Sequence, residues 1–249
     1  MPSKRTANPL PIPILMYHQI EAAPPRGASF RSLYVSPGAF ARQMFFLNVL
    51  GYRGLSMSAL TPYLKGERSG KVVGITFDDG YLNNLTNALP VLQRHGFSST
   101  CYAVSQYVGK TNLWDREIGS RQTLLMNVQQ LRQWLAAGQE VGAHTRHHVH
   151  LAQADAATCK EEMVQCKSEL ENITGSPVRH FCYPYGEYTA DQVGITSALG
   201  FESATSTRRS RCHADDDMLQ LPRVPIVRST TLALFWFKLA TAYEDRRCV

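Results

Sequence analysis

The chain has 249 residues, 44% of them hydrophobic, so it can bury one sizeable core as a single α/β domain. Its formal net charge is +6, but the basic residues are spread along the chain and form no tail, so nucleic-acid binding rests on net charge alone and is the least supported function. Six cysteines without a CxxC pair predict neither a zinc ribbon nor a disulfide scaffold.

The two ends of the chain carry short apolar stretches. The stretch from Leu10 to Met16 is interrupted by two prolines, so it does not resemble the core of a signal peptide. The run from Leu232 to Phe237 is far too short for a transmembrane span. The sequence therefore predicts no transmembrane segment, and it leaves both the periplasm or cell envelope and the cytoplasm open as compartments.

Taken in chain order, the predicted elements alternate. Ser36 and Pro37 begin a helix that Gly51 ends, and Val72 to Phe77 is a β-branched and aromatic run typical of a buried strand. Further helices are expected over 83–94, 128–137, 154–173, 190–199 and 230–243, and further strands over 99–104, 140–143, 179–183, 202–204 and 223–227. This alternation predicts parallel strands in either an open doubly wound sheet or a closed barrel. We expect one domain over residues 1–249, with its core at about 14–237.

Three polar clusters come directly after predicted strands. They are Asp78-Asp79-Gly80, the run from His144 to His148, and Tyr183-Pro184-Tyr185-Gly186. In a parallel barrel the carboxyl ends of all strands lie on one face, so side chains that are remote in sequence converge there. Each cluster by itself also fits an ordinary turn or a solvated loop, but their shared position predicts a site.

The residue types in these clusters suit a catalytic metal. Two histidines four residues apart, together with a carboxylate, form a three-ligand site that leaves positions open for water and substrate. Zinc is the expected cation for such nitrogen and oxygen ligands. Two adjacent carboxylates are also easier to keep charged beside a cation.

The motifs Thr76-Phe77-Asp78-Asp79-Gly80, His144-Thr145-x-x-His148 and Tyr183-Pro184-Tyr185-Gly186 resemble those of the polysaccharide deacetylase family, the NodB-homology carbohydrate esterases of family 4. Their order and spacing match, and the resemblance extends from about Ile14 to Phe237. It implies a distorted (β/α) barrel of about seven parallel strands. It also implies a divalent metal, usually zinc, held by Asp79, His144 and His148, with Asp78 as the general base.

The resemblance further implies the reaction, which is metal-assisted removal of N-acetyl groups from a glycan that contains N-acetylglucosamine. Asp78 takes a proton from the attacking water, and the backbone N–H of Tyr185, in the turn with Tyr183 and Pro184, helps to stabilise the oxyanion. Two alternatives stay open. One is a deformylase or amidohydrolase of the same superfamily that acts on a lipid-linked amino sugar or a cyclic amide, and the other is a catalytically impaired glycan-binding domain. The oligomeric state is not determined by the sequence.

The chain departs from the better-known members of this family at the general acid. These members place a histidine in a Leu-x-His motif near the C-terminus, but this chain has no histidine after His213. Leu15-Met16-Tyr17-His18 instead resembles the first strand of the poly-N-acetylglucosamine deacetylase subgroup. His18 is therefore a candidate pocket residue and general acid. The alternative is that His18 only caps the first strand.

A second departure concerns the arginine that often precedes the Pro-aromatic turn and orients the base, because Cys182 stands there. Arg223 is a candidate substitute, and a surface salt bridge is the alternative for this residue.

Trp114 fits either a sugar-stacking platform or the buried core. His147 and His150 are alternative metal ligands or exposed loop residues. Cys159 and Cys166, seven residues apart on one helix, are expected to pack in the core.

Overall fold

The computed structural model describes residues 11–247. The expectations that concern Leu10 and Cys248 lie outside these described residues, as do the ends of the predicted domain over 1–249. Within the described part of the chain, no helix combines the length and the apolar character that crossing a bilayer requires.

Seven parallel strands close into a barrel. The sheet order runs from β1 through β10, β9, β8, β7 and β6 to β5, and β1 also pairs with β5 and so completes the ring. The prediction of a barrel of about seven parallel strands is therefore confirmed, and the open doubly wound sheet is wrong. The barrel strands are β1 (Ile14–Tyr17), β5 (Val72–Phe77), β6 (Thr100–Ala103), β7 (Glu140–Ala143), β8 (His180–Cys182), β9 (Ser203–Arg209) and β10 (Leu221–Pro225).

Within residues 11–247, three short strands lie outside this ring. β4 (Arg53–Leu55) and β6 pair with the same edge of β5. β4 pairs with the first half of that edge and β6 with the second half. β2 (Gln19–Ile20) and β3 (Tyr34–Val35) form a separate two-stranded sheet. The sequence pattern did not predict β4, because three residues are too few for a period of two to be recognised.

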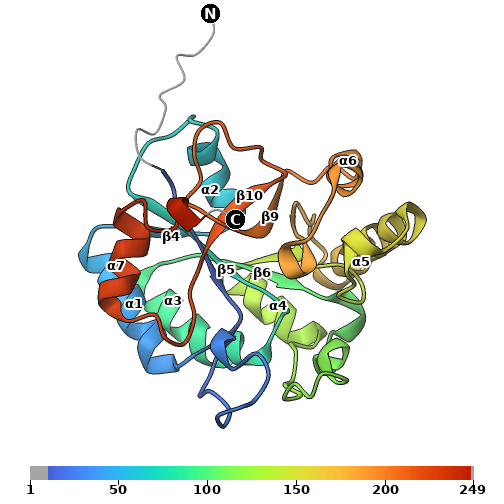
Figure 1. Ribbon diagram of the computed structural model, residues 1–249, viewed down its shortest axis with the longest axis horizontal. Coiled ribbons are helices and arrows are strands. Elements are labelled where there is room, and N and C mark those ends of the chain that lie inside the picture. The colour runs from blue at the N-terminus through green and yellow to red at the C-terminus, as the bar shows by residue number, and fades with distance from the viewer. Residues whose placement is uncertain (1–10, 248–249) are drawn as a thin grey trace, which may run out of the picture.

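Helices surround the barrel, with α1, α3 and α7 together on one side and α4 beside α5 on another (Figure 1). Side chains cap several of their first turns, including Ser36 before α1 and Asp155 before α5, which satisfies backbone N–H groups that a helix leaves unpaired. The helices are α1 (Pro37–Val49), α2 (Met57–Leu64), α3 (Leu89–His95), α4 (Val128–Ala136), α5 (Ala156–Thr174), α6 (Ala190–Ala198) and α7 (Leu232–Ala240).

The helix expected over 83–94 is divided into two parts. Residues Asn84–Ala88 form a wider π-helical turn, and α3 begins only at Leu89. Pro90 explains this break, because proline has no N–H for the carbonyl one turn earlier and its ring crowds that carbonyl. α2 was not predicted, and it contains Pro62.

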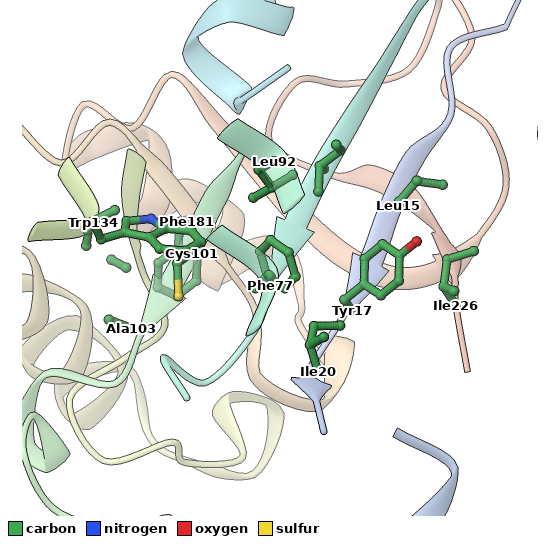
Figure 2. Packing of buried hydrophobic residues seen from close by; sticks show 14 of the residues in the cluster. Leu15, Tyr17, Ile20, Phe77, Leu92, Cys101, Ala103, Trp134, Phe181 and Ile226 are labelled. Carbon is green, nitrogen blue, oxygen red and sulfur yellow. The ribbon is translucent and has the colours of Figure 1, made fainter. Parts of the chain in front are cut away.

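The core fills the space between the barrel and the helices. Figure 2 shows side chains from strands and helices packed together, among them Tyr17 of β1, Phe77 of β5 and Trp134 of α4. The Phe77 ring lies 5.7 Å from that of Tyr17 and 5.9 Å from that of Trp134. Burying each such side chain stabilises the fold by about 1.5–3 kcal/mol, so the end of β5 is firmly anchored. Cys159 and Cys166 belong to this core, as predicted.

Candidate metal centre and active site

One small pocket, with a cavity volume of about 80 Å³, lies at the carboxyl ends of the barrel strands. Asp78 and Asp79 reach it from the end of β5, His144 and His148 from the loop after β7, and His18 from the end of β1. Tyr183 and Tyr185, which follow β8, also line this pocket. The barrel thus brings together residues that the sequence separates by more than 160 positions.

Asp79, His144 and His148 form a cluster that fits a cation. Nε2 of each histidine lies 3.4 Å from Oδ1 of Asp79, and all three side chains are buried. Ligands at zinc bond lengths in a tetrahedral arrangement are about 3.3–3.5 Å from one another. The carboxylate oxygen therefore already lies at such a separation from each imidazole nitrogen, and the three ligand atoms all lie within 4.8 Å of one another.

The electrostatics of this cluster point the same way. Burial lowers the pKa of His148, which favours the neutral imidazole that binds a metal. Burial also opposes a proton on His144, but the charge of Cys182 and the hydrogen bond with Asp79 outweigh it and raise the pKa of His144 well above its usual value. The pocket thus attracts positive charge, which a divalent cation supplies as well as a proton does.

Asp78 is held by Arg223, which comes from β10. The guanidinium donates to both carboxylate oxygens, with distances of 2.6 and 2.7 Å, and it also donates to Ser206 O at 2.8 Å. Arg223 is fully buried, so the alternative of a surface salt bridge is wrong. Cys182, which stands where an arginine was expected, has its Sγ 3.1 Å from Arg223 Nη2.

Two opposing effects set the pKa of Asp78. Burial raises it, but the charge and the hydrogen bonds of Arg223 lower it by more, and His18 and His144 add to the lowering. The net result is a pKa below the usual aspartate value. Asp78 is therefore ionised at neutral pH, and an ionised carboxylate is able to accept a proton.

His18 lies at the mouth of the same pocket, with its Nε2 3.8 Å from Oδ2 of Asp78 and its side chain 16% exposed. The chain has eight histidines, and three of them line the pocket: His18, His144 and His148. His18 is thus the pocket imidazole outside the metal cluster. It directly follows β1, and its backbone carbonyl accepts a hydrogen bond from Asn84 Nδ2 at 3.0 Å.

The turn after β8 presents Tyr185 to the pocket. Tyr185 has a φ of 57°, and Gly186 after it has a φ of 76°. The Tyr183 hydroxyl donates to the carbonyl of Leu219 at 3.0 Å and lies 3.1 Å from Thr196, so this group anchors the turn from behind. Pro184 is buried and is not among the residues that line the pocket.

Strained backbone is concentrated at this site. Within residues 11–247, the non-glycine residues with positive φ are Phe30, Asp79, Thr145, His148 and Tyr185. Four of them line the pocket, and Thr145 lies in sequence between His144 and His148. Such conformations each cost about 1–3 kcal/mol and persist where the surroundings fix them, often at functional sites.

The other histidines of the loop after β7 lie outside the metal cluster. Nδ1 of His147 is 2.6 Å from Glu162, and Nδ1 of His150 is 3.1 Å from Glu187. Neither residue belongs to a described group of side chains that could hold a metal ion. His150 stacks on Tyr185, with ring centroids 3.7 Å apart.

The sequence did not point to several residues that line the pocket. Phe30 and Leu33 come from the loop between β2 and β3, and Asp115 and Ser120 come from the long segment between β6 and α4. Burial, aided by the charge of Asp79, raises the pKa of Asp115 to about 6. No local motif marks these positions, because loops that fold over a site have no period.

Comparisons with known proteins agree with this geometry. A family model described as "Polysaccharide deacetylase" matches residues 65–204. YxkH of Bacillus subtilis (strain 168), which is designated a polysaccharide deacetylase, is 27% identical over 224 residues, covering 89% of this chain and 74% of YxkH. The poly-β-1,6-N-acetyl-D-glucosamine N-deacetylase of Staphylococcus epidermidis is 21% identical over 201 residues, covering 76% of this chain and 67% of that enzyme.

Among solved structures, the Streptococcus pyogenes deacetylase PplD in complex with acetate is similar with a TM-score of 0.80. The two sequences are 25% identical, and the match covers 93% of this chain and 99% of PplD. The similarity in fold therefore extends over nearly the whole of both chains.

Proposed function

This chain belongs to the polysaccharide deacetylase family, and from this premise we propose that it is a metal-dependent hydrolase that removes N-acetyl groups from a polysaccharide or oligosaccharide containing N-acetylglucosamine. The observation that carries the proposal is an ionised, buried Asp78 beside a cluster of three metal-ligand side chains. A domain that only bound glycans would have no need of such a base. The name of the S. epidermidis relative supports N-acetylglucosamine as the sugar.

Asp79, His144 and His148 would hold the cation, for which we propose zinc on the basis of the ligand types and their separations. When bound, the cation would polarise the acetyl carbonyl and make a water molecule more acidic. The tasks of the protein are then to orient the acetyl group, to accept one proton and to donate another.

Asp78 accepts the proton of the attacking water. Arg223 holds both oxygens of this carboxylate and keeps it ionised, so the base has a fixed direction and is ready at neutral pH. Arg223 thus takes the place of the arginine that Cys182 replaces. The backbone N–H of Tyr185 is the proposed donor to the oxyanion, and Tyr183 and Pro184 keep its turn in place.

His18 is the proposed general acid. The departing amine needs a proton, because an amide anion is a very poor leaving group. His18 lies in the pocket, on the side of Asp78, and contributes an imidazole that no metal-ligand role occupies. A proton donor at this position would act on the nitrogen of the sugar as the C–N bond breaks.

The experiment is metal analysis of the purified protein, followed by acetate release from N-acetylglucosamine oligomers. We expect Asp78→Asn to keep its metal and to lose about 10²–10⁴-fold in kcat, and His18→Ala to lose kcat with little change in KM. Asp215→Asn, at an exposed loop position, is the matched control and should behave as wild type.

Each other outcome has a defined meaning. Wild-type protein that binds no metal or releases no acetate contradicts the proposal. Release of formate, or of a ring-opened product from a cyclic amide, would favour the related deformylase or amidohydrolase. Full turnover of metal-loaded His18→Ala would remove His18 from the mechanism but leave Asp78 as the base.

A further inference from the structure

The two histidines of the metal cluster are held in different ways. Nδ1 of His144 is 2.7 Å from the carbonyl oxygen of Cys182, so a hydrogen bond fixes the plane of its ring. Nδ1 of His148 is buried and has no hydrogen-bond partner among residues 11–247. Metal-binding histidines almost always use their second ring nitrogen in a hydrogen bond that sets their orientation. Something else must therefore orient His148.

The backbone does not supply this orientation. His148 has a φ of 60°, a conformation that L-residues seldom adopt. Its backbone N–H donates to Thr145 Oγ1 at 3.0 Å, which holds the main chain of the loop. The side chain beyond Cβ is still free to turn about its own bonds unless its ring meets neighbours.

Two aromatic rings enclose the imidazole of His148. The Trp114 ring stacks on it, with centroids 4.8 Å apart and an interplanar angle of 22°. The Tyr185 ring meets it nearly at a right angle, with centroids 4.6 Å apart and an interplanar angle of 73°. His150 stacks on Tyr185 at 3.7 Å, and Tyr107 contacts Trp114 at 5.2 Å, so both rings are themselves supported.

We propose that Trp114 is a positioning residue for the metal site, and that its stacked indole ring does for His148 what a hydrogen bond does for His144. The inference rests on the proposed function only in taking His148 as a metal ligand. It gives Trp114 a role different from both alternatives raised by the sequence. Its ring is half-buried and is in contact with His148, so it is neither a free sugar platform nor a fully buried core residue.

A ring that has lost this contact can rotate out of the direction in which its Nε2 meets the cation. Binding would then have to reorder the imidazole each time, which lowers the affinity for the metal without removing a ligand. Losing the partner that orients a histidine ligand typically weakens metal binding by about 10–100-fold. Stacking is weaker than a charged hydrogen bond, so we expect the lower end of that range.

The test measures the dissociation constant of Zn²⁺ by competition with a fluorescent chelator, on apo protein whose folding is checked by circular dichroism. We expect Trp114→Ala to bind Zn²⁺ about tenfold more weakly than wild type, and Trp114→Phe, which keeps a stacking ring, to stay within about threefold. Trp236→Ala is the matched control, because Trp236 lies 40% exposed on α7, and it should bind as wild type does.

A double-mutant cycle identifies the route of the effect. With His148→Ala as background, Trp114→Ala should cause no further loss, because the ring that it positions is gone. An equal loss of Zn²⁺ affinity in both backgrounds would show that Trp114 acts on the fold in general. The inference would also be overturned if Trp114→Ala bound Zn²⁺ as tightly as wild type, or if Trp114→Phe bound it as weakly as Trp114→Ala. Wild-type Zn²⁺ binding and acetate release are measured first, so failure of the proposed function is recognised separately.

Discussion

At the residue scale, Asp78 and Arg223 depend on each other. Both are buried, and a buried ion pair is stable only because each charge satisfies the other. Arg223 also donates to Thr76 and to Ser206, so its position is fixed before it meets the carboxylate. The same pairing that keeps Asp78 ionised for catalysis therefore also contributes to the stability of the barrel.

Replacing Arg223 with Met should make stability depend on pH. In the wild type the pKa of Asp78 is lower in the folded state than in the unfolded state. The ion pair therefore stabilises the folded protein at pH values above the unfolded-state pKa, and this stabilisation is lost as the pH falls through the folded-state pKa. In Arg223→Met the lowering by Arg223 is lost, and only the smaller effects of His18 and His144 still oppose burial, so we expect that pKa to rise. We expect a loss of about 3–5 kcal/mol at pH 7.5 and a smaller loss at pH 5, measured by urea unfolding of the apo protein.

The double variant Arg223→Met with Asp78→Asn is the control for this prediction. It removes the lone buried charge, so most of the stability at pH 7.5 should return and the added pH dependence should disappear. A loss that is the same at both pH values, or that the second substitution does not relieve, would mean that Arg223 acts through packing alone.

At the element scale, the turn after β8 is closely constrained by the neighbouring strand β9. A Cβ at Gly186 would overlap both the side chain and the backbone nitrogen of Thr207 on β9. The positive φ of Gly186 is unfavourable for any residue with a Cβ. The turn that presents Tyr185 thus depends on a glycine at this position, because β9 passes directly behind it.

Gly186→Ala should consequently damage the turn. We expect it to lower the free energy of unfolding by about 1–3 kcal/mol and to reduce kcat, because the displaced turn carries the Tyr185 N–H away from the substrate. Urea unfolding and acetate release measure the two effects. Gly194→Ala is the matched control. Gly194 lies within α6 and has no neighbour within 4 Å of an added Cβ, so alanine there should be neutral or stabilise by up to about 1 kcal/mol.

At the scale of the whole molecule, barrel closure is what creates the site. β1 pairs with β5 on one side and with β10 on the other, so His18, Asp78 and Arg223 come together although they are far apart in the sequence. The proposed metal ligands follow β5 and β7, with β6 between these strands. A bound cation therefore links separate parts of the ring in the folded state only.

This linkage predicts that Zn²⁺ stabilises the entire fold. At a free concentration of about 100 times the dissociation constant, a ligand that binds only the folded state adds about 2.7 kcal/mol. For a chain of this length that corresponds to a rise in Tm of about 5–10 °C, measured by differential scanning calorimetry with and without chelator. His148→Ala should show a much smaller rise at the same Zn²⁺ concentration. An equal rise in this variant would indicate binding elsewhere.

The sequence by itself determined the alternation of strands and helices, for a local reason, and the resemblance of its motifs to the polysaccharide deacetylase family implied the closed barrel. Strands, helix caps and turn glycines depend on a few neighbouring residues, and the carboxyl ends of parallel strands must share one face, so Asp79, His144 and His148 could be placed without coordinates. It missed β4 and α2, where the pattern was too short or contained a proline, and it did not show the π-helical turn before α3.

Only the tertiary structure decided the contacts between side chains on separate elements. From the sequence, Arg223 could form either a surface salt bridge or an ion pair with the proposed base. The register of β10 against β1 and β9 placed it in the barrel beside Asp78. Trp114 was likewise open until the segment between β6 and α4 folded onto His148. Such contacts depend on how segments that are remote in sequence pack against each other. Local sequence patterns do not reveal this packing, because it is decided only when the barrel closes.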